Sequence, residues 1–402
     1  MKVIFIMKRK LLLVLSIVIL CSCITSCNSN ASLDNNNCSD HIFENGICTI
    51  CRALQNQGLS FRLNDDKNSY MIDGIGKCKD TEIHIPDEYE GKPVTSICAR
   101  AFEDCEQINS VIVGESVIEI GSSAFEGCKN LTNISLSDSI VCIRAGAFSN
   151  TGYYSDKANW DNGVIYIDNH LIKATYELSD EYQIKQGTTT IADYAFENCF
   201  SLRNVIIPDS LIYIGRRSFS DCAKLTNVTI PDNVKVIGEG CFSSCDNLKS
   251  IKLPSELKEI KADTFSFCSN LENISLPNSI TEIGDDAFKY CDSLTQISIP
   301  SNVKTINKGV FSSCDNLKSV SLPDGITSIK LCAFADCGNL QTINIPKSVT
   351  SIEMEVFWKC SKLKQINFDG TKNDWYNIPK DIRWNYHTGN YTIYCTDGNI
   401  NK

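Results

Sequence analysis

The chain has 402 residues, of which 43% are hydrophobic and 21% charged, a composition typical of a globular protein with an extended core. The formal net charge is −10. Without the four basic residues of positions 1–27, 34 Lys and Arg remain against 48 Asp and Glu, which gives −14. Such an acidic surface repels phosphate backbones, so nucleic acid is not an expected partner.

Residues 1–27 have the pattern of an export signal. The basic stretch Lys8-Arg9-Lys10 precedes an apolar run from Leu11 to Leu20, which is too short to span a bilayer and is followed by small residues. The sequence Ile24-Thr25-Ser26-Cys27 resembles a bacterial lipobox, which implies acylation of Cys27 as the new N-terminus. Because each buried CH₂ of an acyl chain adds about 0.8 kcal/mol, we expect a lipid-anchored protein on an extracytoplasmic membrane face. A plain cleaved signal or an uncleaved anchor is the alternative.

Residues 28–58 combine a polar tether with a small cluster of cysteine and histidine. Cys38 and His41 have CxxH spacing, and Cys48 and Cys51 have CxxC spacing. These four side chains could close a tetrahedral structural zinc site. The gap between the two pairs is short, so a disulfide in an oxidising compartment, or no site at all, are the competing interpretations. No other cofactor is expected.

The remainder of the chain is organised by a 23-residue period. A phenylalanine recurs at this interval at Phe196, Phe219, Phe242, Phe265, Phe288, Phe311, Phe334 and Phe357, and before them at Phe102, Phe125 and Phe148. A fixed period in this range predicts a solenoid, in which each unit buries its apolar edge against its neighbours.

Each unit predicts two short strands and a turn. The pattern Leu-x-x-Ile-x-Leu-Pro favours a first strand, Ile-x-x-Ile-Gly a second strand on the opposite flank, and Ala-Phe-x-x-Cys a turn with short helical character. Equivalent strands of successive units would stack in parallel about 4.7–4.9 Å apart. We therefore predict a β-rich repeat solenoid over residues 59–368, in the shape of a rod or gentle arc.

The period fails in two places. Phe148 and Phe196 are 48 residues apart, and the extra stretch, assigned to residues 149–190, favours paired strands. Residues 369–402 are rich in aromatic side chains, which we expect to cover the last open coil of the solenoid, although stacking on sugar rings is an alternative use.

Ten cysteines follow a unit phenylalanine by three positions: Cys105, Cys128, Cys199, Cys222, Cys245, Cys268, Cys291, Cys314, Cys337 and Cys360. A redox or metal-binding stripe is one interpretation. Side chains stacked in register stay about 4.8 Å apart, beyond the ~3.8 Å Cβ separation of a relaxed disulfide. We therefore predict a ladder of small buried hydrophobic groups with inert thiols.

The repeated pattern LTNVTIPDNVKVIGEGCFSSC (225–245) resembles the BspA-like surface leucine-rich-repeat family of bacteria. The resemblance extends to the insert with YY…NW and NGVIYI, the opening CKDTEIHIPDEYEGKPVTSI and the closing GTKNDWYNIP and YTIYCTDGN. It implies a leucine-rich-repeat fold and a cell-surface protein, some relatives of which adhere to host matrix proteins or other cells. No catalytic residues belong to the family pattern.

The sequence contains no arrangement that indicates catalysis. Its four histidines, His41, His84, His170 and His387, are scattered, and no Ser-His-Asp triad or phosphate-binding loop is apparent. We therefore predict that the protein is not an enzyme; the least favoured alternative is an accessory domain of an enzyme system.

A binding surface is the favoured interpretation. The outward positions of the first strands are small and polar and would form a long face of hydrogen-bonding groups with little charge. An irregular insert on a rigid scaffold is the second place where specificity could reside. The candidate residues are Asn227, Thr229, Lys252, Ser275, Ser298, Ser321 and Asn344 on the face, and Tyr153, Tyr154 and Trp160 in the insert. An extracellular or host protein, or a polysaccharide, is the expected partner; a structural surface scaffold without a ligand is the alternative.

Overall fold

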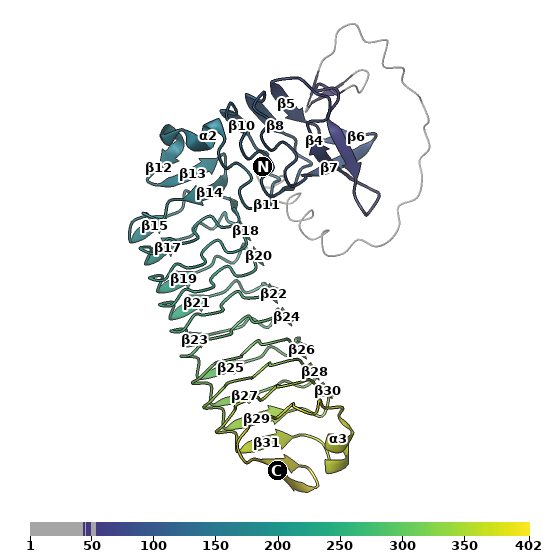
Figure 1. Cartoon of the computed structure of the whole chain (residues 1–402), viewed down its shortest axis with the longest axis vertical. Coiled ribbons are helices and arrows are strands. Elements are labelled where there is room, and N and C mark those ends of the chain that lie inside the picture. The colour runs from purple at the N-terminus through teal and green to yellow at the C-terminus, as the bar shows by residue number, and fades with distance from the viewer. Residues whose placement is uncertain (1–42, 45, 50–53) are drawn as a thin grey trace, which may run out of the picture.

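The computed structural model describes residues 43–44, 46–49 and 54–402. From Ser60 onward they form one elongated stack of coils, in which each regular coil carries two short strands joined by turns (Figure 1). The parallel stacking of equivalent strands confirms the predicted leucine-rich-repeat type of solenoid.

The first strands of the coils form one flank of the stack. They are β5 (Glu82–Ile85), β8 (Ser110–Val113), β10 (Asn133–Ser135), β15 (Glu181–Gln183), β17 (Asn204–Ile206), β19 (Asn227–Thr229), β21 (Ser250–Lys252), β23 (Asn273–Ile274), β25 (Gln296–Ser298), β27 (Ser319–Ser321), β29 (Thr342–Ile345) and β31 (Gln365–Phe368). Ladder hydrogen bonds join them into three sheets, because the ladder stops at the insert and again between β23 and β25.

The second strands form the opposite flank. They are β7 (Lys92–Ile97), β9 (Glu119–Ile120), β11 (Cys142–Ile143), β16 (Thr190–Ile191), β18 (Tyr213–Ile214), β20 (Val236–Ile237), β22 (Glu259–Ile260), β24 (Glu282–Ile283), β26 (Thr305–Ile306), β28 (Ser328–Ile329) and β30 (Ser351–Ile352). In a typical second strand the isoleucine is buried and the preceding residue is half exposed, as in β22 and β26. This alternation places the isoleucines in a continuous core.

The opening of the stack is a cap of antiparallel strands. β3 (Ser60–Leu63) pairs with β4 (Tyr70–Gly74), β4 continues in parallel onto β7, and β6 (Glu88–Tyr89) pairs with the start of β7. The short pair β1 (Phe43–Glu44) and β2 (Ile47–Cys48) precedes this cap.

The phenylalanines form the axis of the core, as predicted. Phe242 and Phe265 are fully buried, and their rings stack with centroids 5.9 Å apart and planes 6° from parallel. Neighbouring rings from Phe196 to Phe357 repeat this geometry with separations of 4.9 to 5.9 Å. Offset stacking of this kind adds to the burial of apolar area in each coil.

The cysteine ladder lies beside the phenylalanines. Nine of its ten members are buried, while Cys105 near the opening is half buried, and all ten ladder cysteines are free thiols. The Cys268 thiol donates a hydrogen bond to the Phe242 carbonyl at 3.1 Å. Burial raises the pKa of Cys128 and of Cys199 to about 12. The burial confirms the interpretation of the ladder as small buried groups, and the raised pKa values support the prediction that the thiols are unreactive.

Each regular turn is tight and contains two left-handed residues. In one unit these are Asp263 (φ 55°) and Phe267 (φ 60°), and the amide of Cys268 donates to the Phe265 carbonyl at 3.2 Å. Most units place Asp, Asn, Ser or Gly at such positions, because these residues tolerate positive φ at the lowest cost. The turns orient successive backbone N–H groups along the solenoid axis toward the next coil.

The insert consists of α2 (Gly152–Ser155), the 3-10 turn η1 (Lys157–Asn159), β12 (Trp160–Asp161), β13 (Val164–Ile167) and β14 (His170–Ala174). β13 pairs antiparallel with both β12 and β14. All four residues of β13 are buried because each face of the strand meets a different core: Val164 and Tyr166 pack into the C-terminal cluster, and Ile165 and Ile167 into the N-terminal one.

This insert acts as a wedge. On the other flank β11 and the β16 region are in direct contact: the Thr190 hydroxyl donates to the Ile140 carbonyl at 3.1 Å and the Asp193 amide to the Ile143 carbonyl at 2.9 Å. β14 also pairs in parallel with β16, but β12 and β13 add thickness on the outer side, and Figure 1 shows the axis turning sharply here. The expected rod or gentle arc therefore holds only on either side of the insert. The first strands lie on the outside of the bend and the second strands on its inside.

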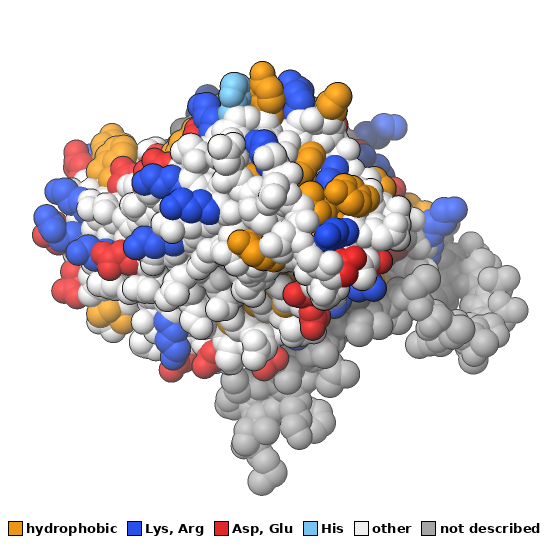
Figure 2. All heavy atoms as spheres, turned by 90° about the horizontal axis from the view of Figure 1, so that it is seen from below, with side chains coloured by type: hydrophobic (Ala, Val, Ile, Leu, Met, Phe, Trp, Pro, Cys, Tyr) orange, Lys and Arg blue, Asp and Glu red, His pale blue; other side chains and the backbone are white. Residues whose placement is uncertain are grey.

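The C-terminal residues cover the last coil, as expected. β32 (Thr392–Cys395) adds in parallel to β31, and β33 (Gly398–Asn401) pairs back onto it. The short helix α3 (Lys372–Asn377) begins with a capping box formed by Thr371 and Asp374. Trp375 is buried, and Trp384 meets the Phe357 ring edge-on at 6.0 Å. Figure 2, which looks onto this end, shows charged side chains of both signs and several exposed hydrophobic side chains.

Candidate functional site

The structure brings the predicted face residues into register. Thr229 of β19 lies opposite Lys252 of β21, and Ser298, Ser321 and Asn344 succeed one another across β25, β27 and β29. We call the outward residues of the first strands from β17 to β31 the outer polar face. Within these described strands, Lys252 is the only charged outward residue, and Ile206 of β17 is an exposed apolar one. The face lies along the stack beyond the bend, on the flank that forms the outside of the bend (Figure 1).

The outer polar face is divided into two blocks. Its hydrogen-bonded ladder ends at β23 and restarts at β25, and Ser275 lies immediately beyond the end of β23. Ile274 and Leu276 are half buried here, whereas the equivalent Ile251 and Leu253 of the previous coil are buried. The inward packing is therefore looser at this break than in the preceding coil.

Some side chains of the outer polar face are hydrogen-bonded to one another. The Ser250 hydroxyl donates to the Asn227 side-chain oxygen at 2.7 Å, and the Asn367 amide donates to the Asn344 side-chain oxygen at 2.6 Å. The side chains of Ser275 and Ser298, by contrast, make no hydrogen bond within the described part of the chain, and both are exposed. Exposed groups that are free to bond with a ligand therefore occur on both sides of the break.

The insert aromatics are largely used inside the fold. The Tyr153 hydroxyl donates to the Tyr166 carbonyl at 2.9 Å, and the Trp160 indole N–H donates to the Tyr154 carbonyl at 2.8 Å. The rings of Tyr154 and Trp160 meet edge-on at 5.1 Å. All three side chains are half buried, so they fix the insert and offer only part of their surface to a ligand.

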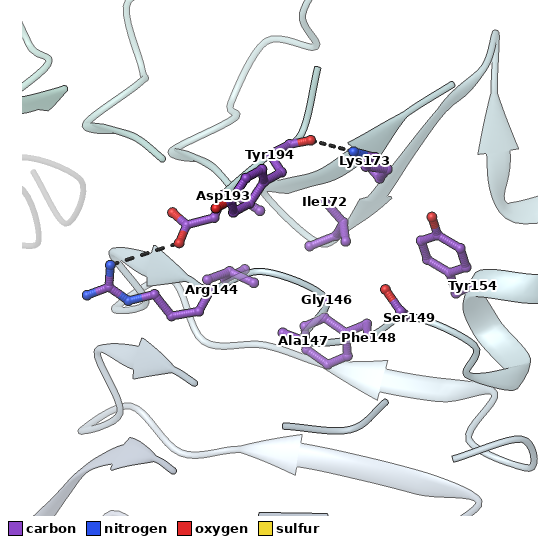
Figure 3. Close-up of a pocket in the computed structure, with 12 residues that line it drawn as sticks. Arg144, Gly146, Ala147, Phe148, Ser149, Tyr154, Ile172, Lys173, Asp193 and Tyr194 are labelled. Atoms are coloured by element: carbon purple, nitrogen blue, oxygen red, sulfur yellow. Dashed lines mark hydrogen bonds and ion pairs between the residues drawn. The ribbon is translucent and has the colours of Figure 1, made fainter. Parts of the chain in front are cut away.

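A cavity of about 100 Å³, here called the bend cavity, opens beside the insert. The turn of residues 143–149 forms one wall, residues 192–194 the opposite wall, and Ile172, Lys173 and Tyr154 the sides (Figure 3). The Lys173 ammonium donates to the Tyr194 carbonyl at 2.5 Å, and burial lowers the pKa of this lysine. Sequence reasoning missed this site. The available signal was the 48-residue gap, which contains no second Ala-Phe-x-x-Cys turn.

A polar cluster closes the inside of the bend. Arg144 pairs with Glu119 at 2.8 Å and reaches Asp193 at 4.0 Å, and the Asp193 carboxylate also accepts a hydrogen bond from the Arg216 amide at 2.8 Å. Burial raises the pKa of Asp193. The cluster joins residues from both sides of the insert, which fits a structural role at the joint.

The predicted zinc ligands Cys38, His41 and Cys51 lie outside the described residues, as does Cys27. Cys48 is described and is buried in β2. Across the described ranges no group of three His, Cys, Asp or Glu side chains is placed to hold a metal ion. In the same residues, no helix combines the length and the apolar character needed to cross a bilayer.

The repeated coil, with parallel strands on two flanks and one buried phenylalanine in each regular unit, defines a leucine-rich-repeat solenoid. The family model described as "BspA type Leucine rich repeat region (6 copies)" matches residues 76–199, 174–295 and 281–379, together more than half of the chain. The chain belongs to this BspA-type leucine-rich-repeat family.

The chain is similar to a solved leucine-rich cell surface protein from Faecalibacterium prausnitzii, at 28% identity and TM-score 0.40 over 81% of this chain and 97% of that one. A leucine-rich-repeat protein of T. pallidum is 27% identical with TM-score 0.27 over 59% and 88% of the two chains. A leucine-rich-repeat protein from Eubacterium ventriosum is 20% identical with TM-score 0.39 over 83% and 91%. A search among curated proteins found no match.

Proposed function

We propose that this protein is a membrane-anchored, extracytoplasmic binding module that engages a protein or glycan ligand through the outer polar face. The single observation that carries the proposal is the face itself: stacked Asn, Ser, Thr and Gln side chains, with one charge and one exposed isoleucine, Ile206, on the exposed flank of a rigid scaffold. A flat surface of donors and acceptors suits ligands that offer many hydrogen-bonding groups, such as a glycan or an exposed backbone.

A structural surface component without a discrete ligand is the second candidate. It is favoured by the bonds between Asn227 and Ser250 and between Asn344 and Asn367, because groups that are already paired gain less from a ligand. The two functions differ in whether saturable binding exists.

The test is a binding panel of matrix proteins, mucins and polysaccharides against the purified mature chain. Substituting Ser275, Ser298 and Ser321 together by Lys should weaken binding at least tenfold, because it places three charges on both sides of the break. The matched control substitutes Thr281, Thr327 and Thr350 by Lys, which are exposed residues beside the second strands. Equal losses in both triple variants would contradict a role of the outer polar face. No binding to any panel member would favour the scaffold.

Anchoring is tested separately in the producing cell. Cys27→Ala should abolish labelling with radioactive palmitate and release the protein from the membrane fraction. Labelling that persists in this variant would exclude Cys27 as the acylated residue, whatever the binding panel shows.

A further inference from the structure

Backbone N–H groups link each turn of the solenoid to the next. In the unit of Phe265, the amides of Asp263, Phe265 and Phe267 donate to carbonyls of the following turn at 3.0, 2.9 and 2.7 Å. The equivalent three amides donate to the following turn, or to the C-terminal cap, in nine of the other ten phenylalanine units. These bonds are a constant feature of the fold.

The exception is the unit of Phe148. Its equivalent donors are the amides of Gly146, Phe148 and Asn150, and none of them has an acceptor among the described residues. The reason is the insert, which follows this unit with β14 where a turn would otherwise stack. Gly146 (φ 68°) and Asn150 (φ 57°) keep the left-handed conformation of their counterparts, so the N–H groups keep their direction along the axis. Gly146 and Phe148 line the bend cavity.

Further donors lie around the bend cavity, together with acidic groups: Asp193 lines it, Glu197 interacts electrostatically with Lys173, and Glu126 lies near Gly146. Figure 3 shows the hydroxyl groups of Ser149 and Tyr154 on the cavity side, opposite Lys173. The Lys173 ammonium has three N–H donors and uses one of them on the Tyr194 carbonyl. The Asp193 carboxylate turns toward Arg144 (Figure 3), and Ile172 supplies an apolar wall.

We propose that the bend cavity binds a carboxylate group. Successive N–H groups of a turn with left-handed residues form a concave anion site, and the nearby ammonium adds a full positive charge. A carboxylate offers about four acceptor positions, enough for the two amides, the ammonium and one hydroxyl. The volume of about 100 Å³ is well above the ~10–15 Å³ that one water requires, so the cavity has room for a group as small as a carboxylate. The cavity lies away from the outer polar face, so this inference does not depend on the proposed function.

The test is a titration of the ¹⁵N-labelled mature chain with sodium acetate, followed by amide chemical shifts. The signals of Gly146 and Phe148 should move saturably, while those of Asp263 and Phe265, whose amides are bonded, should stay. Acetamide and sodium chloride at equal concentrations should have no such effect. Absence of a saturable shift, or an equal response to chloride, would overturn the proposal. Parallel titrations with N-acetylglutamate and glucuronate then show whether a peptide or an acidic sugar is the better source of the carboxylate.

A variant pair supplies the second measurement. Lys173→Met keeps the aliphatic stem but removes the ammonium and should weaken acetate binding tenfold or more. Lys185→Met, at an exposed lysine of the same region, is the control and should bind as the wild type does. If Lys173→Met perturbs the spectrum widely, Ser149→Ala combined with Tyr154→Phe replaces it and must also weaken binding. Unchanged affinity in the variant that remains folded would refute the assignment.

Discussion

The regular stack from Phe196 to Phe357 and the bend at residues 149–192 belong to the same solenoid. They differ in how the aromatic rings stack and in how the backbone amides are hydrogen-bonded. In the stack each ring meets a ring on both sides, and each turn satisfies the amides of the previous one. At the bend no ring contact joins Phe148 to Phe196 within the described residues; Phe196 instead meets Tyr182 at a tilt of 55°. The three axial amides of the Phe148 unit are left without a neighbouring turn.

This difference shows where a solenoid can acquire a specific site. Similar units satisfy the backbone hydrogen-bonding groups of their neighbours, so a regular flank offers only a repeated surface. An interruption leaves backbone amides without the hydrogen bonds that they make in regular units. It also brings together side chains from distant positions, such as Arg144 and Asp193. We therefore expect stability to reside in the stack and curvature in the wedge.

Replacing the wedge by regular units should have the largest effect. If residues 149–195 are exchanged for residues 243–287, which fill the space between Phe242 and Phe288, the 23-residue period runs through the former insert. The solenoid should then straighten, because no layer remains on the outside of the bend alone. Small-angle scattering should show a larger maximum dimension than for the wild type, and an unchanged scattering profile would contradict the wedge account.

The next largest effect concerns the ring stack. Phe265→Ala should cost about 3–5 kcal/mol in the free energy of unfolding, as expected for a buried aromatic truncation. Phe148→Ala should cost about 1 kcal/mol less, because Phe148 stacks only on Phe125 whereas Phe265 stacks on both Phe242 and Phe288. Urea unfolding of both variants measures the difference. A larger cost at Phe148 would show that the wedge supports its ring as well as a neighbouring coil does.

The buried thiols predict a loss of stability in alkali. The folded-state pKa of Cys128 is about 12, raised from 9.0 by burial. The contribution of the neutral Cys128 thiol to the free energy of unfolding is fully present below its unfolded-state pKa. It is lost as pH rises from about 9 toward 12, because only the thiol of the unfolded chain ionises in this range. Each such thiol should contribute about 1.4 kcal/mol per pH unit in this window. Urea unfolding of Cys128→Ala should show a correspondingly shallower alkaline slope than the wild type, and identical slopes would contradict the assignment.

The sequence was sufficient to predict the stack because its constraints repeat. The phenylalanine and cysteine ladders can be predicted from residue spacing alone, because the same spacing recurs in successive units. The wedge occurs once, and a run such as Val164 to Ile167 does not reveal that its two faces meet different cores. The sharp bend and the bend cavity depend on that packing. The break between β23 and β25 has no evident local signal in the sequence, and we have no physical account of it.

The smallest predicted effect tests the joint of the bend through Asp193. Burial raises its folded-state pKa above the ordinary 3.8, so its favourable contribution is present below that value and is lost as pH rises through the folded-state pKa. Asp193→Asn keeps an oxygen that can accept from the Arg216 amide but removes the titration. The free energy of unfolding of the wild type should therefore fall relative to this variant above pH 3.8, by at most about 1.4 kcal/mol per pH unit, and level off once Asp193 is ionised.

Urea unfolding between pH 3.5 and 7 follows this difference, with Asp161→Asn, which changes an exposed carboxylate of the insert, as the control. A difference that stays constant with pH would mean that Arg144 and the Arg216 amide compensate the burial of Asp193 completely. A difference of the opposite sign would mean that the ion pair with Arg144 dominates and that the joint is held together by charge. The expected sign instead implies that the contact of β11 with the β16 region depends on packing and backbone hydrogen bonds, and that the buried carboxylate is tolerated there at a cost.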